Sequence, residues 1–514
     1  MHPSSFASKY GIGDLGKEAY EFIDFLAESG QHIWQILPLG PTGFGDSPYQ
    51  CLSAFAGNAL FISLDDVVDV GFLSKEDVGN PPAPENEEHI SYGQVIDYKS
   101  GLLAKAFRNF KKSTDTGLQT AFLAFCQKND WWLNDYALFR VLKDKHGSQS
   151  WDKWDPKLAK RDEAALAKAE ADFSEEVEEH KFYQYLFFKQ WSKLKQYANE
   201  KKIAIVGDLP IFVAYDSVDV WRYPEFFKLD EDGVPIVVSG VPPDYFSATG
   251  QLWGNPLYNW DNIREDNFGW WIRRMEMSLE TVDVIRIDHF RGFAASWEIP
   301  YGETTAQKGK WVTTPGMEFF TALQKHFGDT LPIIVEDLGV ITPDVEELRD
   351  TFEFPGMRIL QMAFGGDACN IDLPHNYIPH SVVYTGTHDN DTAIGWFNSQ
   401  AGAGSSRTQE QIDFERERCL KYLKSDGKNI NWDFIHSAFA SVSAIAIIPM
   451  QDVLGLGSTS RMNLPASQQG NWAWRMKANA LTPEITQKLK DLTSLYGRDN
   501  PILSYQPVIS AATV

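Results

Sequence analysis

Three short apolar runs in this chain each end in a carboxylate, and this feature constrains the fold more than any other. The runs are residues 282–288, 331–336 and 382–389, and their last acids are Asp288, Glu336 and Asp389. Short runs rich in Val and Ile predict strands that are buried on both faces, as in a parallel sheet covered by helices. An acid that ends such a strand lies at the edge where parallel α/β barrels place their active sites.

Four further apolar runs predict strands of the same kind, so that seven strands are expected between residues 33 and 449. These runs are residues 33–38, 203–208, 357–364 and 444–449. Helical patterns lie between several of the strands, for example at residues 317–327 and 343–352. Alternation of strand and helix is typical of a parallel sheet. The sequence therefore predicts an α/β protein.

Two stretches interrupt this alternation. Residues 60–199 predict a mainly helical insertion, and residues 209–270 predict a loop-rich insertion. Within the second stretch, residues 239–256 are rich in Pro and Gly and carry three aromatic residues. Such a loop either binds or covers a site or forms an ordered surface loop, and we favour binding. We interpret residues 1–514 as a single catalytic domain, although the length also accommodates two or three domains.

Charge and composition exclude several partners. The formal net charge is -23 without a local basic stripe, so a nucleic acid or an anionic membrane surface would be repelled. No apolar run approaches the length of a membrane span. The four cysteines show no CxxC spacing, which favours a reducing compartment and a cytoplasmic location, without a zinc site. The negative net charge favours a neutral or small partner. The 17 Trp residues offer faces that stack on sugar rings, with a place in the core as the alternative for most of them.

Three acids at strand ends match the needs of an enzyme that cuts and remakes a glycosidic bond. Any one of them could equally be structural, and Asp337 beside Glu336 is interpreted as structural. Arg286 lies two residues before Asp288, so both side chains point to the same face of the strand. We expect its charge to lower the pKa of Asp288 and keep this nucleophile ionised. Glu336 must instead hold a proton, which requires apolar surroundings or a neighbouring negative charge.

A GxGxxG match at residues 11–16 raises the alternative of dinucleotide binding. That fingerprint needs a strand directly before it and an acid at the end of a second strand. Here the preceding residues are polar and aromatic, and the run at residues 33–38 ends in Pro38. The pattern therefore disfavours nucleotide binding.

Longer motifs occur almost from end to end of the chain. Examples are LPLGPTGFGDSPYQ from Leu37, SGVPPDYFSATGQLWGNP from Ser239, RIDHFRG from Arg286, EDLG from Glu336 and YTGTHDND from Tyr384. In these motifs the sequence resembles the 4-α-glucanotransferases, also called amylomaltases or disproportionating enzymes, a transferase branch of the α-amylase-like barrels. The resemblance implies a (β/α)8 barrel of the TIM type without a C-terminal β-domain. In that family the first barrel strand precedes an HP dipeptide, which here is His2-Pro3, so we expect this strand to be truncated.

The resemblance also implies roles for individual residues. Asp288 resembles the nucleophile, Glu336 the general acid/base and Asp389 the carboxylate that stabilises the transition state. Substrate-binding roles are implied for Tyr49 as a stacking platform, for Asp208, Arg286 and His388 around the donor sugar, and for Asp244, Trp253 and Asn463 in two loops that roof the cleft. Residues 209–270 would thus contribute to the roof of the active site. The family implies neither a metal nor a cofactor.

The expected activity is a retaining transfer of α-1,4-glucan segments between maltodextrins, with release of glucose or a short maltodextrin. Donor and acceptor are then α-1,4-glucans, and glucose also serves as an acceptor. Three alternatives stay open, namely a hydrolase of the same barrel class, a glucan-binding protein without activity, and a nicotinamide-dependent oxidoreductase. The sequence does not predict the oligomeric state.

Overall fold

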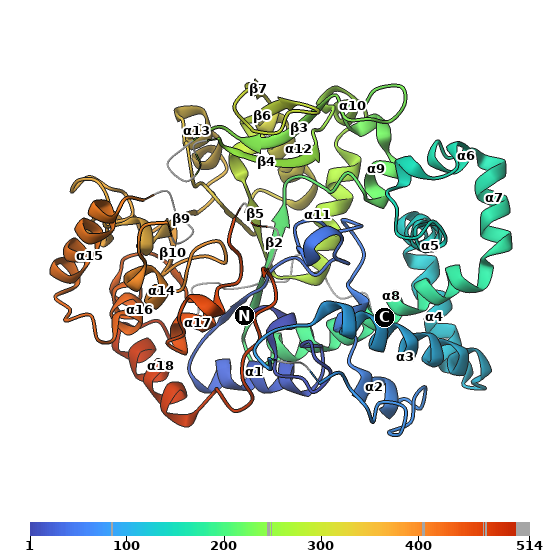
Figure 1. Cartoon of the computed structure of the whole chain (residues 1–514), viewed down its shortest axis with the longest axis horizontal. Coiled ribbons are helices and arrows are strands. Elements are labelled where there is room, and N and C mark those ends of the chain that lie inside the picture. The colour runs from blue at the N-terminus through green and yellow to red at the C-terminus, as the bar shows by residue number, and fades with distance from the viewer. Residues whose placement is uncertain are drawn as a thin grey trace.

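Short parallel strands form the centre of the molecule, and Figure 1 shows β2 and β5 there. The computed structural model describes residues 1–83, 86–243, 247, 249–402, 407–465, 467 and 470–499. One parallel sheet contains, in spatial order, β1 (Ile33–Gln35), β2 (Ala204–Pro210), β5 (Val284–Asp288) and β8 (Ile333–Val335). A second contains β11 (Ile445–Ile447), β10 (Ser381–Tyr384) and β9 (Gly356–Ile359). All seven predicted strands are therefore confirmed.

The two parallel sheets are linked through β8 and β9, because Val335 N donates a hydrogen bond of 3.1 Å to Pro355 O. All seven strands contribute side chains to one apolar cluster. Its members include Ile33, Val206, Val284, Ile334, Met357, Val382 and Ile445. The strands are shorter than the apolar runs that predicted them. Residues 360–362 form a 3-10 helix, since Leu360 packs with Phe364 in a separate cluster instead of extending β9.

Helices precede most of the strands, as the sequence predicts. They are α1 (Lys17–Glu28), α11 (Gly269–Thr281), α12 (Gly316–Phe327), α13 (Pro343–Thr351) and α16 (Ile430–Ala440). In α1 the buried side chains include Ala19, Phe22, Ile23 and Leu26, which recur at the spacing of one helix face. The predicted helices at residues 317–327 and 343–352 are confirmed by α12 and α13.

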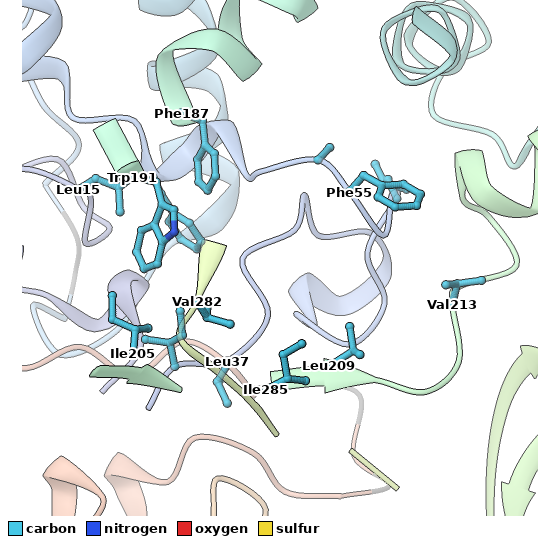
Figure 2. Close-up of a cluster of buried hydrophobic side chains, with 14 of the residues drawn as sticks. Leu15, Leu37, Phe55, Phe187, Trp191, Ile205, Leu209, Val213, Val282 and Ile285 are labelled. Atoms are coloured by element: carbon cyan, nitrogen blue, oxygen red, sulfur yellow. The ribbon is translucent and has the colours of Figure 1, made fainter. Parts of the chain in front are cut away.

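In the described part of the chain between β1 and β2 there are seven helices. They are α2 (Leu64–Asp69), α3 (Tyr92–Lys112), α4 (Thr116–Lys128), α5 (Asp130–Lys145), α6 (Pro156–Ala159), α7 (Glu163–Asp172) and α8 (Ser174–Glu200). The long helix α8 leads back to the sheet. Figure 2 shows Phe187 and Trp191 of α8 in one buried cluster with Ile205 of β2 and Ile285 of β5. Gln184 of α8 also binds both backbone groups of Gly57.

A separate antiparallel sheet lies beside the parallel strands. Its order is β4 (Gln251–Pro256), β3 (Val237–Val241), β6 (Ala295–Pro300) and β7 (Lys310–Thr313). The prediction that residues 239–256 form one long loop is therefore wrong at both ends. β6 and β7 lie outside this stretch, so its own pattern does not reveal the pairing. Gly240 permits the close approach of β3 and β4, because a Cβ atom there would lie 2.2 Å from Gln251 O.

The GxGxxG segment has a packing role. A Cβ atom at Gly13 would lie 1.9 Å from Pro3 O, so only glycine fits against the preceding turn. In the described residues no strand precedes Gly11. After Trp474 the described chain forms helix α18 (Pro483–Leu495) and no strand. None of the described helices combines the length and the apolar character needed to cross a bilayer.

Candidate active site

The three strand-end acids meet at one cavity of about 1340 Å³. Asp288 is the last residue of β5, Glu336 directly follows β8, and Asp389 lies in the turn after β10. Because these strands are parallel, their carboxyl ends share one edge of the fold. The other predicted site residues that line this cavity are Tyr49, Trp253, Arg286, His388 and Asn463. Asp208 accepts hydrogen bonds from two of them, Tyr49 and Arg286, and Asp244 lies outside the described residues.

A buried ion pair between Arg286 and Asp208 lies next to Asp288, the candidate nucleophile. Arg286 Nη1 is 2.7 Å from both carboxylate oxygens of Asp208 and 3.2 Å from Asp288 Oδ1. The register of β2 against β5 places Asp208 beside Arg286, so the ion pair follows directly from strand pairing. Asp208 also accepts a hydrogen bond of 2.7 Å from the hydroxyl of Tyr49. Arg286 thus serves two carboxylates, of which Asp208 makes the shorter contacts.

The pKa of Asp288 differs from the sequence-based expectation. Burial and the negative charge of Asp208 raise this pKa to about 6, although the charges of Arg286 and His388 act in the opposite direction. The charge of Arg286 does lower this pKa, as expected, but the effect of burial is larger and the charge of Asp208 adds to it, so the pKa ends above the ordinary value. A carboxyl group with a pKa of about 6 is nevertheless mostly ionised at neutral pH.

Glu336 has surroundings that favour its protonated form. Burial and the charge of Asp288 raise its pKa well above the ordinary range, as the sequence led us to expect. Its Oε2 atom accepts a hydrogen bond of 2.6 Å from His289 N, whose residue has a left-handed φ of 53°. The neighbouring Asp337 is held by Arg349 and by Met357 N at 2.8 and 2.7 Å. These contacts agree with the structural role predicted for Asp337.

Asp389 is half-exposed at the cavity and held by a neighbouring segment. Asn463 Nδ2 donates to Asp389 Oδ1 at 2.7 Å, and His388 Nε2 lies 3.4 Å from the same oxygen. Arg461 donates to the backbone oxygens of Asp389 and Asn463, at 2.6 Å in each case. The turn after β10 and the segment that follows the 3-10 helix at Ser458–Ser460 are therefore joined at the acid.

Aromatic rings line the cavity next to the acids. Tyr49 stacks on His388 with ring centroids 5.1 Å apart, and Trp472 lies 5.6 Å from Tyr49. The edge of Trp253 meets His289 at 4.7 Å. Burial and the charge of Asp208 raise the pKa of Tyr49 well above its ordinary value. Its phenol therefore stays protonated and can donate a hydrogen bond to Asp208. Flat apolar faces with polar groups between them suit a polyhydroxylated ring.

The sequence patterns did not predict several residues that line the cavity. His289 occurs in the RIDHFRG motif, and its position next to Asp288 could have drawn attention to it. Arg461 and Trp472 lie on a segment far from the acids in sequence, and no local pattern marks them. Only the fold brings them to the cavity.

A carboxyl group with a strongly raised pKa beside a mostly ionised carboxylate is the arrangement that acid-assisted cleavage of a glycosidic bond uses. Together with its position at the edge of a parallel sheet, it defines an enzyme that acts on glycosidic bonds. A family model described as 4-alpha-glucanotransferase matches residues 1–482. The chain belongs to this family.

Individual relatives agree with the family match. A 4-alpha-glucanotransferase of Synechocystis sp. is 49% identical over 501 residues, which are 97% of each chain. One of Thermus thermophilus is 48% identical over 498 residues, or 95% of this chain and 96% of that protein. The solved structure of an amylomaltase from Streptococcus agalactiae in complex with acarbose matches with a TM-score of 0.91 and 41% identity. That match covers 97% of this chain and 99% of the other.

Proposed function

We propose that this chain transfers α-1,4-glucan segments between maltodextrins by a double displacement that retains the anomeric configuration. One observation carries the proposal, namely that two acids with different surroundings line the same cavity. Asp288, with a pKa of about 6, is available as an anionic nucleophile at neutral pH. Glu336, with its strongly raised pKa, is available as a proton donor. Retaining enzymes divide the work between two carboxyl groups in this way.

In the first step Asp288 attacks the anomeric carbon of the donor and forms a glycosyl ester. The bond to the leaving oxygen breaks, and Glu336 gives this oxygen its proton. In the second step Glu336 takes the proton from the 4-hydroxyl of an acceptor glucan, which attacks the anomeric carbon and releases Asp288. Asp389 stabilises the positive charge that develops on the sugar ring. Asn463 and His388 orient its carboxylate for this role.

The remaining site residues bind the donor sugar. Arg286 and Asp208 form an ion pair next to Asp288. Tyr49 donates a hydrogen bond to Asp208 and stacks on His388, so it connects this ion pair to the aromatic residues of the cavity. Trp253 adds a further aromatic side chain from β4. Asp244 is assigned to the roof of the cleft on the family resemblance alone.

The proposal includes the domain organisation and the type of barrel. We assign residues 1–514 to one catalytic domain with a (β/α)8 barrel, supported by the apolar cluster that all seven strands share. Residues 60–199 are assigned as the helical insertion and residues 209–270 as part of the roof. The free state of all four cysteines supports a cytoplasmic location.

Incubation with maltotriose tests the proposed reaction. Transfer yields glucose together with longer maltodextrins, while the total number of reducing ends stays nearly constant. A steady rise in reducing ends would instead identify a hydrolase, which uses the same three acids. Transfer prevails when a bound acceptor outcompetes water in the covered cavity.

The variant Asp288→Asn tests the mechanism. It keeps the shape of the side chain but removes the nucleophile, so we expect transfer to fall by at least about a thousandfold. Bound maltodextrin should still be detectable by calorimetry. Unchanged turnover in this variant would refute the double displacement, and a wild-type protein that binds maltodextrins without turnover would be a glucan-binding protein.

A further inference from the structure

The cavity continues well beyond the three acids, as far as helix α15 (Gln409–Leu423). Glu410, Gln411, Phe414 and Glu415 of this helix line it together with Asp288 and Glu336. Figure 1 shows α15 at the outer left of the molecule, with β9 and β10 between this helix and β5. One continuous cavity therefore joins the reacting acids to a distant helix that is not among the site residues described above.

Phe414 is exposed on the face of α15 that lines the cavity. It lies three residues after Gln411 and four after Glu410, a spacing that puts the three side chains on one helix face. The exposed fraction of Phe414 is 54%. Among the described residues, the other exposed aromatic side chains are Tyr301 and Tyr496, and neither lines the cavity. Phe414 thus combines an accessible ring with a place inside the cavity.

Three arginines hold α15 firmly against the cavity walls. Arg418 donates to the backbone oxygens of Gly365, Gly366 and Asp367, which line the cavity in the loop after β9. Arg416 donates to the backbone oxygens of Phe397 and Ser399. Arg407 forms a largely buried ion pair of 2.6 Å with Glu415. The helix that carries Phe414 is therefore held in place by these contacts.

The cavity has room for a ligand longer than one sugar. Its volume of about 1340 Å³ exceeds the roughly 300–1,000 Å³ of ordinary small-molecule sites. The ring of Phe414 offers a flat apolar face, and the side chains of Glu410 and Gln411 offer hydrogen-bonding groups beside it. Such a combination matches a glucose residue, with its apolar ring face and its equatorial hydroxyls.

We propose that Phe414 is a stacking platform for a glucose residue of the bound glucan that lies several units from the reacting bond. The inference rests on the proposed function and deepens it, because it makes α15 a determinant of chain length. A short maltodextrin that occupies only the region around the acids does not reach Phe414. A longer one does, and gains affinity there.

Comparison of two substrates tests this platform. In Phe414→Ala, kcat/KM for maltoheptaose should fall about tenfold, the effect of losing one aromatic stacking contact, whereas kcat/KM for maltotriose should change less than about twofold. Phe414→Tyr should retain the wild-type preference because it keeps the ring, and Phe414→Leu should behave like the alanine variant. Tyr301→Ala removes an equally exposed ring outside the cavity and should alter neither value.

Binding measurements separate this inference from the proposed reaction. Maltoheptaose is titrated into Asp288→Asn with and without Phe414→Ala, so that no turnover occurs. A roughly tenfold weaker Kd in the double variant supports the platform even if the wild type proves to be a hydrolase. Equal Kd values, or equal losses of kcat/KM for both substrates, would overturn it. Failure of the wild type to turn over either substrate would instead reject the proposed function.

Discussion

At the scale of single residues, burial and the charge of Arg286 determine the protonation of Asp288 and Glu336, and Arg286 interacts with two carboxylates at once. Arg286 contacts both Asp208 and Asp288, and its shorter contacts are with Asp208. Burial of Asp288 is therefore only partly compensated, and its pKa settles at about 6. The resulting negative charge raises the pKa of Glu336 in turn. One arginine thus influences both the nucleophile and the acid.

This charge arrangement predicts a bell-shaped pH dependence of kcat/KM. Activity should rise through about pH 6 as Asp288 loses its proton, and it should fall at high pH once Glu336 loses its own. In Asp208→Asn the negative charge next to Asp288 is gone, so the acidic limb should move to lower pH. The measurement is kcat/KM for maltotriose across the pH range.

Asp232→Asn is the matched control for the pH profile, because this acid has a side chain that is 82% exposed and lies outside the cavity. It should leave both limbs in place. An acidic limb that stays unchanged in Asp208→Asn would show that Asp208 does not influence the ionisation of Asp288.

The raised pKa of Asp288 also predicts a conflict between activity and stability. Its pKa in the folded protein, about 6, exceeds the ordinary 3.8, so the ionised group costs stability at every pH above about 6. The cost decreases as the pH falls, because the folded protein takes up the proton first. Asp288→Asn should therefore raise the free energy of unfolding at neutral pH by about 1–3 kcal/mol.

Thermal unfolding of wild type and Asp288→Asn at neutral pH and at about pH 4 measures this effect. The variant should have the higher Tm at neutral pH, and most of the difference should vanish in acid. A variant that is less stable at neutral pH would mean that the ion pair with Arg286 outweighs the burial of the carboxylate.

At the scale of elements, the sequence predicts strands better than it predicts their partners. Buried β-branched runs identify all seven parallel strands, because the apolar pattern is local. The antiparallel strands β3 and β4 were missed. β4 pairs with β3, and β3 pairs in turn with β6, which lies more than fifty residues away in sequence. The same limit applies to the site. The acids follow from their strands, whereas Arg461 and Trp472 come to the cavity only through the fold of distant segments.

Arg461 is expected to position Asp389. Its guanidinium joins the turn after β10 to the segment that carries Asn463, through two backbone oxygens. Each such bond contributes about 1.5–3 kcal/mol, so Arg461→Ala should lower kcat about 10–100-fold. KM should change much less if the effect falls mainly on the stabilisation of the transition state.

Two further variants separate positioning from general destabilisation in the Arg461 experiment. Arg461→Lys keeps the charge and one donor and should recover part of kcat. Arg264→Ala removes an arginine whose ion pairs with Asp261 and Glu318 are exposed, and it should keep the wild-type kcat. If Arg461→Ala keeps the wild-type kcat, the hydrogen bond from Asn463 is sufficient to orient Asp389.

At the scale of the whole molecule, the negative charge of the surface does not influence the binding of a neutral substrate. The net charge of -23 repels anions and gives the folded chain considerable self-repulsion. A maltodextrin carries no charge, so the field of the protein neither attracts nor repels it. The chemistry of the cavity depends on Arg286, Asp208, Asp288 and Glu336, which are largely enclosed and therefore weakly screened by salt.

Raising NaCl from about 20 to about 200 mM should therefore change kcat/KM for maltotriose less than about twofold. Over the same range the Tm should rise by about 1–3 °C, because salt screens the repulsion among the surface carboxylates. The two measurements are made on the same samples, so the shift in Tm confirms that the salt reaches the protein charges. A steep change in kcat/KM would show that salt screens the charges of the active-site groups, and it would contradict their enclosure in the cavity.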